Sequence, residues 1–338
     1  MKKMSLEKIS NAYGLFDKAI DLLKNSLDSS YIDALVETGD NLLENGGVLI
    51  ENGRPTQDIV NELEKIYKNF LEIHLSSEEI RQVIQFSLVK AGKVDKIQSN
   101  HQMTPDSIGV LIAHLLERIL IGRNEVKILD ITIGTGNLLG TVTNYLKQNG
   151  VKKIELFGVD NDDTLLAIAG ISFKMQKNEI QLFHQDAIDN LITPKVDLVL
   201  SDLPVGYYPI DERVVNFETK SKKGHSFVHH LLIEQALLQL IPGGWGVFLV
   251  PKALFESEES KKLIEVIQKQ AHFQGILNLP SDLFSSANST KSLLLLQKRG
   301  GSARQAKPIL LGGFPSIKEK VAFAKFIRQI DNWIKENS

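Results

Sequence analysis

Three aspartates stand directly after short apolar runs that have the composition of buried strands. Asp130 ends VKILD, Asp160 ends IELFGVD, and Asp186 follows IQLFHQ. The carboxyl ends of parallel strands meet at one edge of a sheet, which is where such sheets bind their ligands. One acid at a strand end is common. Three in succession predict a site that binds amino and hydroxyl groups.

A glycine turn follows the first of these strands, in the stretch DITIGTGNLLG. Gly134 and Gly136 have no side chain, so they allow a tight bend and a close approach of the backbone to a ligand. Taken alone, the turn is explained equally well as a plain connection between a strand and a helix. The dinucleotide pattern G-x-G-x-x-G is not matched, because Leu139 stands at its third glycine and Gly140 comes one position later.

Together, the acids and the turn match the polar groups of S-adenosylmethionine better than those of NAD. Asp130, just before the turn, is badly placed for a pyrophosphate but suits a cationic amino group. The glycines suit a carboxylate, and the two later acids suit ribose hydroxyls and an adenine amine. We therefore predict S-adenosylmethionine as the ligand, with an NAD enzyme as the alternative.

Seven short apolar runs separated by helical segments must position these residues. They are VKILDI, IELFGVD, IQLFHQD, VDLVLSD, WGVFLVP, GILNLP and SLLLLQKR. Strands that alternate with helices predict crossover connections and an α/β fold with a doubly wound, mostly parallel, Rossmann-like sheet. The link between the last two runs is too short for a packed helix, so we expect a hairpin whose last strand is antiparallel.

The chain before the sheet has helical spacing and few strand signals. We predict an all-helical amino-terminal domain over 1–95, a domain that holds the sheet over 96–315, and a carboxyl-terminal helix over 316–338 that packs on the sheet domain. The apolar stripes of the first domain are most simply explained as core.

Composition excludes several classes of protein. With 43% hydrophobic residues the chain can bury a large core, and with no cysteine it has neither disulfides nor thiolate metal sites. A net charge of -2 excludes a protein whose whole surface binds nucleic acid, although a local basic face is compatible with it. The first residues lack the apolar core of a signal peptide and no run has membrane length, so we expect a cytoplasmic protein without membrane contact.

The ordered motifs resemble those of class I S-adenosylmethionine-dependent methyltransferases. Over 102–299 the chain resembles the N6-adenine DNA methylases related to modification subunits of type I restriction systems. The motifs are Gln102-Met103-Thr104-Pro105, one residue shorter than the family's Q-x-x-T-P element, D-x-x-x-G-T-G-N-L-L at 130–139, the long helix with its P-G-G turn and strand at 227–251, and the closing hairpin at 276–299. The resemblance implies a seven-stranded methyltransferase sheet.

The resemblance also implies roles for the residues at the strand ends. Thr104, Gly134 and Gly136 would contact the methionine part of the cofactor, Asp130 its amine, Asp160 the ribose hydroxyls and Asp186 the adenine amine. The neighbours assigned to the same site are Ile133, Asn137, Asn161 and Ala187. For Thr104 the alternative is a helix N-cap before Pro105.

The stretch SDLPVGYYP, which ends the fourth predicted strand, corresponds to the N-P-P-F/Y or D-P-P-Y motif of the family. There, the first side chain and a backbone carbonyl accept both hydrogens of an exocyclic amine and point its lone pair at the sulfonium methyl. The resemblance places Asp202 at the first position and Pro204 at the second proline. It implies catalysis by positioning and local electrostatics.

Two residues depart from this motif. Leu203 replaces the first proline, and we expect it to loosen the turn. Val205 replaces the aromatic residue on which a flipped base stacks, a contact worth about 1–3 kcal/mol. Tyr207 or Tyr208 is the expected replacement platform, and a role in covering the edge of the core explains these tyrosines equally well.

The predicted activity is methyl transfer to the N6 amine of adenine in DNA, with extrusion of the base from a duplex. An RNA base or a protein amide is the alternative acceptor. A regulatory or scaffold protein that binds S-adenosylmethionine without transfer is the alternative to an enzyme. Sequence specificity would come from the helical domain, the lysine loop described below or a separate specificity subunit, and a homodimer is compatible with the chain.

A long polar loop follows the fourth strand, and the start of a helix follows the loop. Its lysines, which either grip phosphates or form a solvated cluster, are Lys220, Lys222 and Lys223. Three histidines stand at the end of the loop and in the helix start: His225, His229 and His230. Two of the histidines are adjacent and no cysteine is near, so no metal site is predicted.

Overall fold

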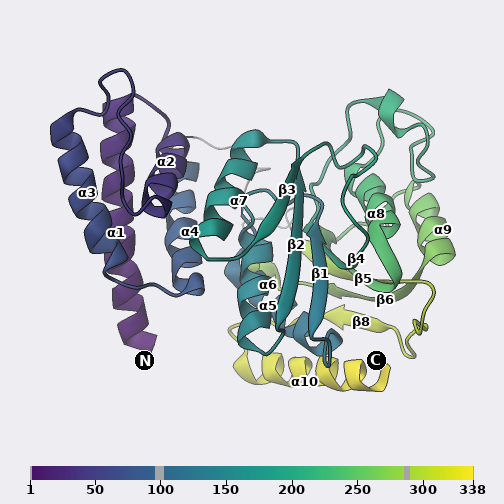
Figure 1. Ribbon diagram of the computed structural model, residues 1–338. Coiled ribbons are helices and arrows are strands. Elements are labelled where there is room, and N and C mark those ends of the chain that lie inside the picture. Colours follow the sequence, from purple (N-terminus) through teal and green to yellow (C-terminus); the bar gives the residue numbers. More distant parts are fainter. Residues whose placement is uncertain (1, 96–102, 285–289, 338) are drawn as a thin grey trace. The chain divides into compact units, whose positions relative to one another are not determined.

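Four helices form the amino-terminal part of the chain in the computed structural model, which describes residues 2–95, 103–284 and 290–337 (Figure 1). They are α1 (Lys2–Leu27), α2 (Tyr31–Leu43), α3 (Gln57–Leu71) and α4 (Ser77–Val94). Serines define two of their starts: Ser30 caps α2, and Ser76 forms a capping box with Glu79 at α4. Each cap satisfies amide groups that have no partner in the first turn of a helix.

A fifth helix, α7 (Asp163–Met175), completes the first compact unit, which combines the described residues up to Met103 with 134–144 and 162–180. The apolar stripes of α1 to α4 bury one another, and the side chains of α7 join the same core. Gly39 on α2 permits the close contact with α7, since a Cβ there would lie 2.1 Å from a methyl carbon of Ile171.

The second unit consists of 104–133, 145–161 and the described residues from 181 onward, and it is built around a sheet. The strands are β1 (Glu125–Asp130), β2 (Lys153–Asp160), β3 (Ile180–His184), β4 (Val196–Asp202), β5 (Leu240–Pro251), β6 (Ala271–Asn278), β7 (Lys291–Lys298) and β8 (Leu310–Gly313). Their order is β3-β2-β1-β4-β5-β7-β6-β8.

This topology confirms the predicted doubly wound α/β sheet. β1 pairs in parallel with β2 and β4, β4 pairs in parallel with β5, and β7 is antiparallel to both β5 and β6. The prediction of seven strands missed β8, which pairs in parallel with β6 and follows β7 in the chain. The sequence of β8, LLGG, is short and half glycine, so it has neither the length nor the composition typical of a strand.

The remaining helices are α5 (Asp106–Ile119), α6 (Asn137–Gln148), α8 (Val228–Gln239), α9 (Ser260–Gln270) and α10 (Lys320–Asn337), with short 3₁₀ turns η2 (Asp211–Val214) and η3 (Ser281–Leu283). In the second unit, α8 packs on β4 and β5, α9 packs on β6, and α10 packs on α5. Trp333 of α10 donates to the Pro308 carbonyl at 2.7 Å. The domain boundaries proposed from the sequence stay a prediction.

The core of the second unit lies between the sheet and these helices and includes Leu129, Val199, Phe248 and Leu294, all fully buried. Because the strands are buried on both faces, they are almost continuously apolar, as in other parallel sheets. None of the helices in the described ranges has the length and apolarity needed to cross a bilayer.

Candidate active site

Four charged side chains meet the same edge of the sheet. Asp130, Asp160 and Asp202 are the last residues of β1, β2 and β4, and Lys291 is the first residue of β7. β7 runs antiparallel to β5, with Lys291 opposite Pro251, so its amino end lies where the parallel strands finish. The ends predicted for the first, second and fourth strands are confirmed, whereas β3 ends at His184, two residues before the predicted Asp186. The structure adds one cation, Lys291, to the acids at this edge.

Asp130 is an enclosed acid whose partners are neutral. Its Oδ1 atom accepts the Ser201 hydroxyl at 2.6 Å and the Thr132 amide at 3.1 Å, and the residue is 2% exposed. Burial raises the pKa of Asp130 to about 7; the two hydrogen bonds lower the pKa, and the charges of Asp160 and Asp202 raise it. A bound cation would favour the ionised form of this carboxyl group.

Asp202 has partners on both carboxylate oxygens. Thr104 donates its hydroxyl to Oδ2 at 2.7 Å, and the Lys291 ammonium pairs with Oδ1. The Asp202 backbone carbonyl accepts the Thr132 hydroxyl at 3.3 Å. Helix α5 begins at Asp106, two residues after Thr104. The alternative role of Thr104 at the start of this helix stays a prediction.

Leu203, the residue after β4, is held firmly. Its amide donates to the Leu249 carbonyl of β5 at 3.1 Å, and its side chain is fully buried. A proline at this position could not make that hydrogen bond, because proline has no N–H group. The expectation that Leu203 loosens the turn is therefore wrong. The Leu203 carbonyl oxygen lies 3.4 Å from Lys291 Nζ.

Pro204 and Val205 follow in a segment without regular secondary structure, and Val205 is exposed. The next residues pair with the start of α8: Val228 donates its amide to the Gly206 carbonyl at 3.0 Å, and Tyr208 donates its amide to the Ser226 carbonyl at 2.8 Å. This pairing fixes where both tyrosines point.

The two tyrosines have different environments. Tyr208 belongs to the core, and its hydroxyl donates to Asp186 Oδ2 at 2.7 Å. Burial, together with this bond to a carboxylate, raises the pKa of Tyr208 to about 12. Tyr207 is 63% exposed and stacks on Phe227, with ring centroids 4.8 Å apart. Of the two predicted platforms, Tyr207 alone offers an exposed ring.

Asp186 follows β3 and is already engaged by several donors. Arg213 approaches its Oδ2 atom at 3.2 Å, and the Ile188 amide donates to Oδ1 at 3.0 Å. Ala187 beside it is buried. The Gln185 amide donates to the Asp160 carbonyl at 3.0 Å, which links the ends of β2 and β3.

Two further predicted residues of the second unit make backbone contacts. Ile133 is buried, and its amide donates to the Val159 carbonyl at 3.0 Å. The Asn161 carbonyl oxygen lies 3.1 Å from His184 Nε2. The cofactor contacts assigned to both residues stay predictions.

The glycine turn belongs to the first unit and has the backbone that it was predicted to need. Gly134 and Gly136 have φ values of 53° and 76°, and a Cβ at Gly136 would lie 2.7 Å from a ring carbon of Phe173. The side-chain oxygen of Asn137 accepts the buried Arg81 guanidinium at 2.7 Å. Gln102, of the Q-x-x-T-P element, lies outside the described residues.

The lysines of the polar loop between η2 and α8 do not form one cluster. Lys220 donates to the Val215 carbonyl, while Lys222 and Lys223 are exposed. His225 pairs with Asp211 at 3.1 Å.

His229 and His230 point into the core, where burial lowers the pKa of His229 to about 3 and that of His230 to about 4. Among the described residues, no group of three His, Cys, Asp or Glu side chains is placed to hold a metal ion.

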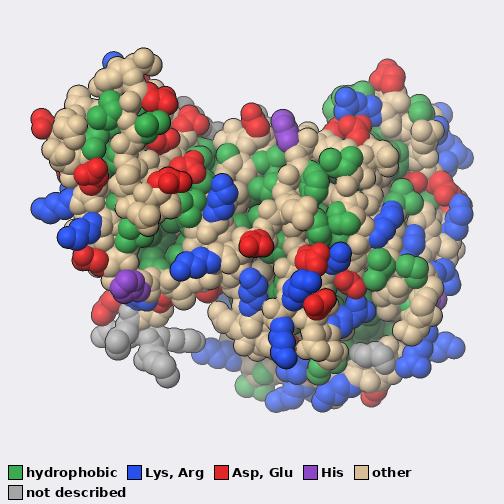
Figure 2. Space-filling view, in the orientation of Figure 1, with side chains coloured by type: hydrophobic (Ala, Val, Ile, Leu, Met, Phe, Trp, Pro, Cys, Tyr) green, Lys and Arg blue, Asp and Glu red, His purple; other side chains and the backbone are tan. Residues whose placement is uncertain are grey.

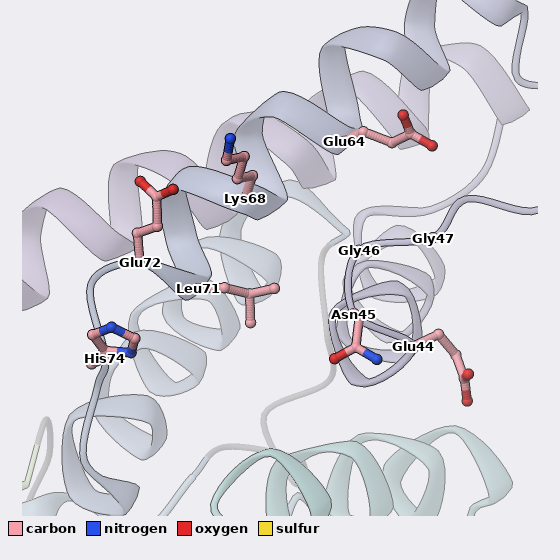
Figure 3. Close-up of a pocket in the computed structure, with 9 residues that line it drawn as sticks. All are labelled: Glu44, Asn45, Gly46, Gly47, Glu64, Lys68, Leu71, Glu72 and His74. Carbon is pink, nitrogen blue, oxygen red and sulfur yellow. The ribbon is translucent and has the colours of Figure 1, made fainter.

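A separate hollow of about 580 Å³ lies in the helical unit (Figure 3). It is lined by Glu44, Asn45, Gly46, Gly47, Glu64, Lys68, Leu71, Glu72 and His74. Figure 3 shows that the charged side chains of α3 do not converge on one point. This hollow therefore lacks the cluster of converging charged groups that is found at the edge of the sheet.

Comparison with known proteins identifies the family of the chain. The family model described as N-6 DNA Methylase matches residues 83–322, and a model described as the YtxK N-terminal helical domain matches residues 10–91. The chain belongs to the N-6 DNA methylase family.

Two curated relatives illustrate the range of this N-6 DNA methylase family. The chain is 38% identical over 333 residues to the uncharacterized protein YtxK of Bacillus subtilis, covering 98% of this chain and 99% of that protein. It is 22% identical over 274 residues to the type I restriction enzyme MjaVII methylase subunit of Methanocaldococcus jannaschii, covering 75% of this chain and 46% of the subunit.

Among solved structures, lmo1582 of Listeria monocytogenes, described as a class I S-adenosylmethionine-dependent methyltransferase, has a TM-score of 0.89 at 38% identity and covers 97% of this chain and 99% of that one. A type I modification subunit from Vibrio vulnificus shares the fold, with a TM-score of 0.60 at 16% identity over 80% of this chain and 61% of that one. These comparisons confirm the predicted class, and S-adenosylmethionine is the cofactor.

Sequence reasoning missed three residues at this edge. Ser201 joins Asp130 to the Ile131 amide, Arg213 contacts Asp186, and Lys291 pairs with Asp202. Lys291 had a readable signal. The predicted hairpin already implied an antiparallel strand, and the first residue of such a strand lies at the edge where the parallel strands end.

Proposed function

We propose that this methyltransferase modifies the exocyclic N6 amine of adenine in DNA. One observation carries the proposal: an Asp202 carboxylate oxygen and the Leu203 carbonyl oxygen both contact a single ammonium nitrogen, that of Lys291. Two such acceptors are what is needed to hold an amine through two hydrogens. The N6 amine of adenine carries two hydrogens and fits the same pair.

The residues at the strand ends fit the cofactor by their chemistry. Asp130 is a buried acid whose pKa of about 7 a cationic amino group would lower again. The positive φ values at Gly134 and Gly136 belong to a turn of bare backbone, the type that admits a carboxylate. When bound, S-adenosylmethionine supplies an electrophilic methyl group on a sulfonium.

The chain's own groups then supply position. Asp202 and Leu203 hold the amine so that its nitrogen lone pair faces the methyl carbon, and Thr104 fixes the rotation of the Asp202 carboxylate through its 2.7 Å hydrogen bond. As the new nitrogen–carbon bond forms and the carbon–sulfur bond breaks, the nitrogen loses one proton, which the Asp202 carboxylate accepts. Orientation and fixed charge account for most of the expected rate.

Tyr207 is the proposed base platform. Its ring is exposed, lies five residues after Asp202 in the chain and is supported from behind by the Phe227 ring at 4.8 Å. A supported ring loses little freedom when a base stacks on it, and such a stack is worth about 1–3 kcal/mol. This assignment leaves Tyr208 as the anchor of Asp186.

DNA as the partner is supported by charge as well as by family. From 298 to 337 the chain has nine Lys and Arg residues against three Asp and Glu. Basic side chains gather along the lower edge of Figure 2, where α10 lies, and Lys320, Lys325, Arg328 and Lys335 are exposed there. Phosphate contacts of this kind give affinity without sequence preference, so a separate specificity subunit or a second copy would select the site.

A transfer assay with labelled S-adenosylmethionine tests the proposal. Because the recognition sequence is unknown, the acceptors are two long amplified DNAs of the same sequence, one made with dATP and one with N6-methyl-dATP. We expect label in the first DNA only. Cellular RNA and protein serve as parallel acceptors.

Each other outcome of the assay points elsewhere. Equal label in both DNAs would exclude the N6 amine. Label in RNA or protein alone would move the acceptor to that class. Tight cofactor binding without transfer to any acceptor would instead favour a regulatory or scaffold protein.

A further inference from the structure

Lys291 stands where the proposed acceptor amine would be held. Its Nζ atom pairs with Asp202 and lies 3.4 Å from the Leu203 carbonyl oxygen, so it contacts both groups assigned to the amine. Like an acceptor amine, it is a nitrogen that donates to two oxygens. The motif that resembles D-P-P-Y is therefore filled by a side chain of the same protein.

The position of Lys291 is set by regular structure. It opens β7, where its backbone pairs with Pro251 of β5, and its carbonyl accepts the Leu279 amide at 3.1 Å. The Lys291 and Asp202 side chains are each 22% exposed, so the pair is partly shielded yet open to solvent. An acceptor can reach this pair, and the lysine can swing outward without unfolding of the strand.

We propose that Lys291 is a specificity-determining residue: it occupies the amine position, and an acceptor must displace it. This inference rests on the proposed function of Asp202 and Leu203. The displaced ammonium needs a new anionic partner, because separating an ion pair without compensation is unfavourable. A nucleic acid brings a phosphate together with the base, whereas a free nucleoside brings none. Lys291 thus selects a polynucleotide over a nucleoside.

Lys291 is assigned the role of an occupant and not that of a methyl acceptor. An ammonium in an ion pair has no lone pair with which to attack a methyl group. We therefore expect Lys291 to stay unmethylated in protein incubated with the cofactor, and the mass of the peptide that contains it checks this point.

The first experiment tests whether the contact exists in solution. The full chain is acetylated for graded times with an N-hydroxysuccinimide ester, and peptide masses give a rate for each lysine. The matched control is Lys252, which is exposed and lies beside the start of β7, its amide bonded to the Thr290 carbonyl at 3.2 Å. We expect Lys291 to react about tenfold more slowly than Lys252 and to become faster in the Asp202→Asn variant, with Lys252 unchanged. Equal Lys291 rates in the wild type and in Asp202→Asn would overturn the proposal.

The second experiment measures selectivity. Wild type, Lys291→Met, Lys291→Gln and the control Lys252→Met are compared on the long amplified DNA made with dATP and on adenosine, after melting temperature and cofactor binding establish that each variant is folded. We expect the Lys291 variants to raise transfer to adenosine at least tenfold relative to DNA, and Lys252→Met to match the wild type. An unchanged ratio would contradict the role of Lys291. If no protein transfers to either acceptor, the proposed function fails, while the acetylation rates still decide whether Lys291 fills the amine position.

Discussion

Two acids at the same edge of one sheet have opposite electrostatic settings. Asp130, at the end of β1, is enclosed by neutral donors and negative neighbours, and burial raises its pKa to about 7. Asp202, at the end of β4, is partly exposed and already paired with the Lys291 ammonium. The residue type is the same, and the surroundings of each carboxyl group make the difference.

The contrast indicates a different task for each acid. Asp130 gains most from a cation that arrives with a ligand, because the ligand offsets the cost of keeping a buried charge. Asp202 has a cation of its own, so a ligand there has to exchange with Lys291. We interpret the first acid as part of the cofactor site and the second as part of the acceptor site.

The largest expected effect is the loss of transfer when Asp202 is removed. Asp202→Ala deletes one of the two oxygens that hold the amine, and methyl transfer to DNA should fall about 10²–10³-fold, as for other positioned polar groups. Initial rates at saturating cofactor measure this effect. Asp197→Asn is the control, since Asp197 lies near the other end of β4 and bonds Arg123 at 2.8 Å. A comparable loss in the control would mean that the strand, and not the site, had been damaged.

The pH dependence of the free energy of unfolding tests whether Asp130, the enclosed acid of the two, has a raised pKa. The raised pKa means that the folded protein keeps a proton that the unfolded chain releases above pH 4, so stability falls as pH rises from about 4 to about 7. Asp130→Asn should remove this slope, a difference on the order of a few kcal/mol across the range. Urea unfolding of both proteins at pH 5 and pH 8 measures it. Parallel pH profiles would show that Asp130 titrates normally.

Cofactor affinity should respond to the same group. Below pH 7 Asp130 must release its proton before it can accept an ammonium, so S-adenosylmethionine affinity should weaken by about tenfold per pH unit. Asp130→Asn should flatten this profile and weaken binding at pH 8 by about ten- to a hundredfold, the worth of a hydrogen bond to a charged group. Calorimetric titration at several pH values provides the test. A flat wild-type profile would contradict the assigned role.

Substitution of the two tyrosines near the proposed acceptor site should have the smallest effects on DNA binding and stability. Tyr207→Ala should weaken DNA binding by the cofactor-loaded protein about tenfold, because the proposed stacking platform is lost. Tyr208→Phe should leave DNA binding unchanged and lower the free energy of unfolding by about 1 kcal/mol, because the bond to Asp186 is lost. Fluorescence anisotropy and urea unfolding separate the two. The reverse pattern would exchange the roles of Tyr207 and Tyr208.

The strand ends could be predicted from the sequence because their signals are local. A buried strand is a run of apolar residues, and Asp130, Asp160 and Asp202 each end one, so pattern alone located the edge. The antiparallel hairpin followed from the length of a loop. The short edge strand β8 did not, because pairing with β6 and not composition makes it a strand.

Contacts between distant segments could not be predicted in the same way. Lys291 meets Asp202 across 89 positions. The predicted hairpin could place Lys291 at this edge of the sheet, but its pairing with Asp202 depends on the register of β7 against β5, which the sequence does not show. The hydrogen bond that holds Leu203 could not be predicted from the sequence either. Replacement of the family's proline by leucine suggested a looser turn, whereas the structure shows the Leu203 amide bonded to the Leu249 carbonyl. Comparison with the family motif identified the change from proline to leucine at position 203. Only the structure showed the hydrogen bond that Leu203 makes in its place.

Product analysis tests the central claim, that Asp202 and Leu203 hold an adenine amine for methylation, most directly. Unmethylated DNA is incubated with S-adenosylmethionine and either the wild type or Asp202→Ala, then digested to nucleosides and analysed by mass spectrometry. We expect N6-methyldeoxyadenosine from the wild type and only a trace of it from the variant. A methylated cytidine, or equal amounts of N6-methyldeoxyadenosine from both proteins, would contradict the account.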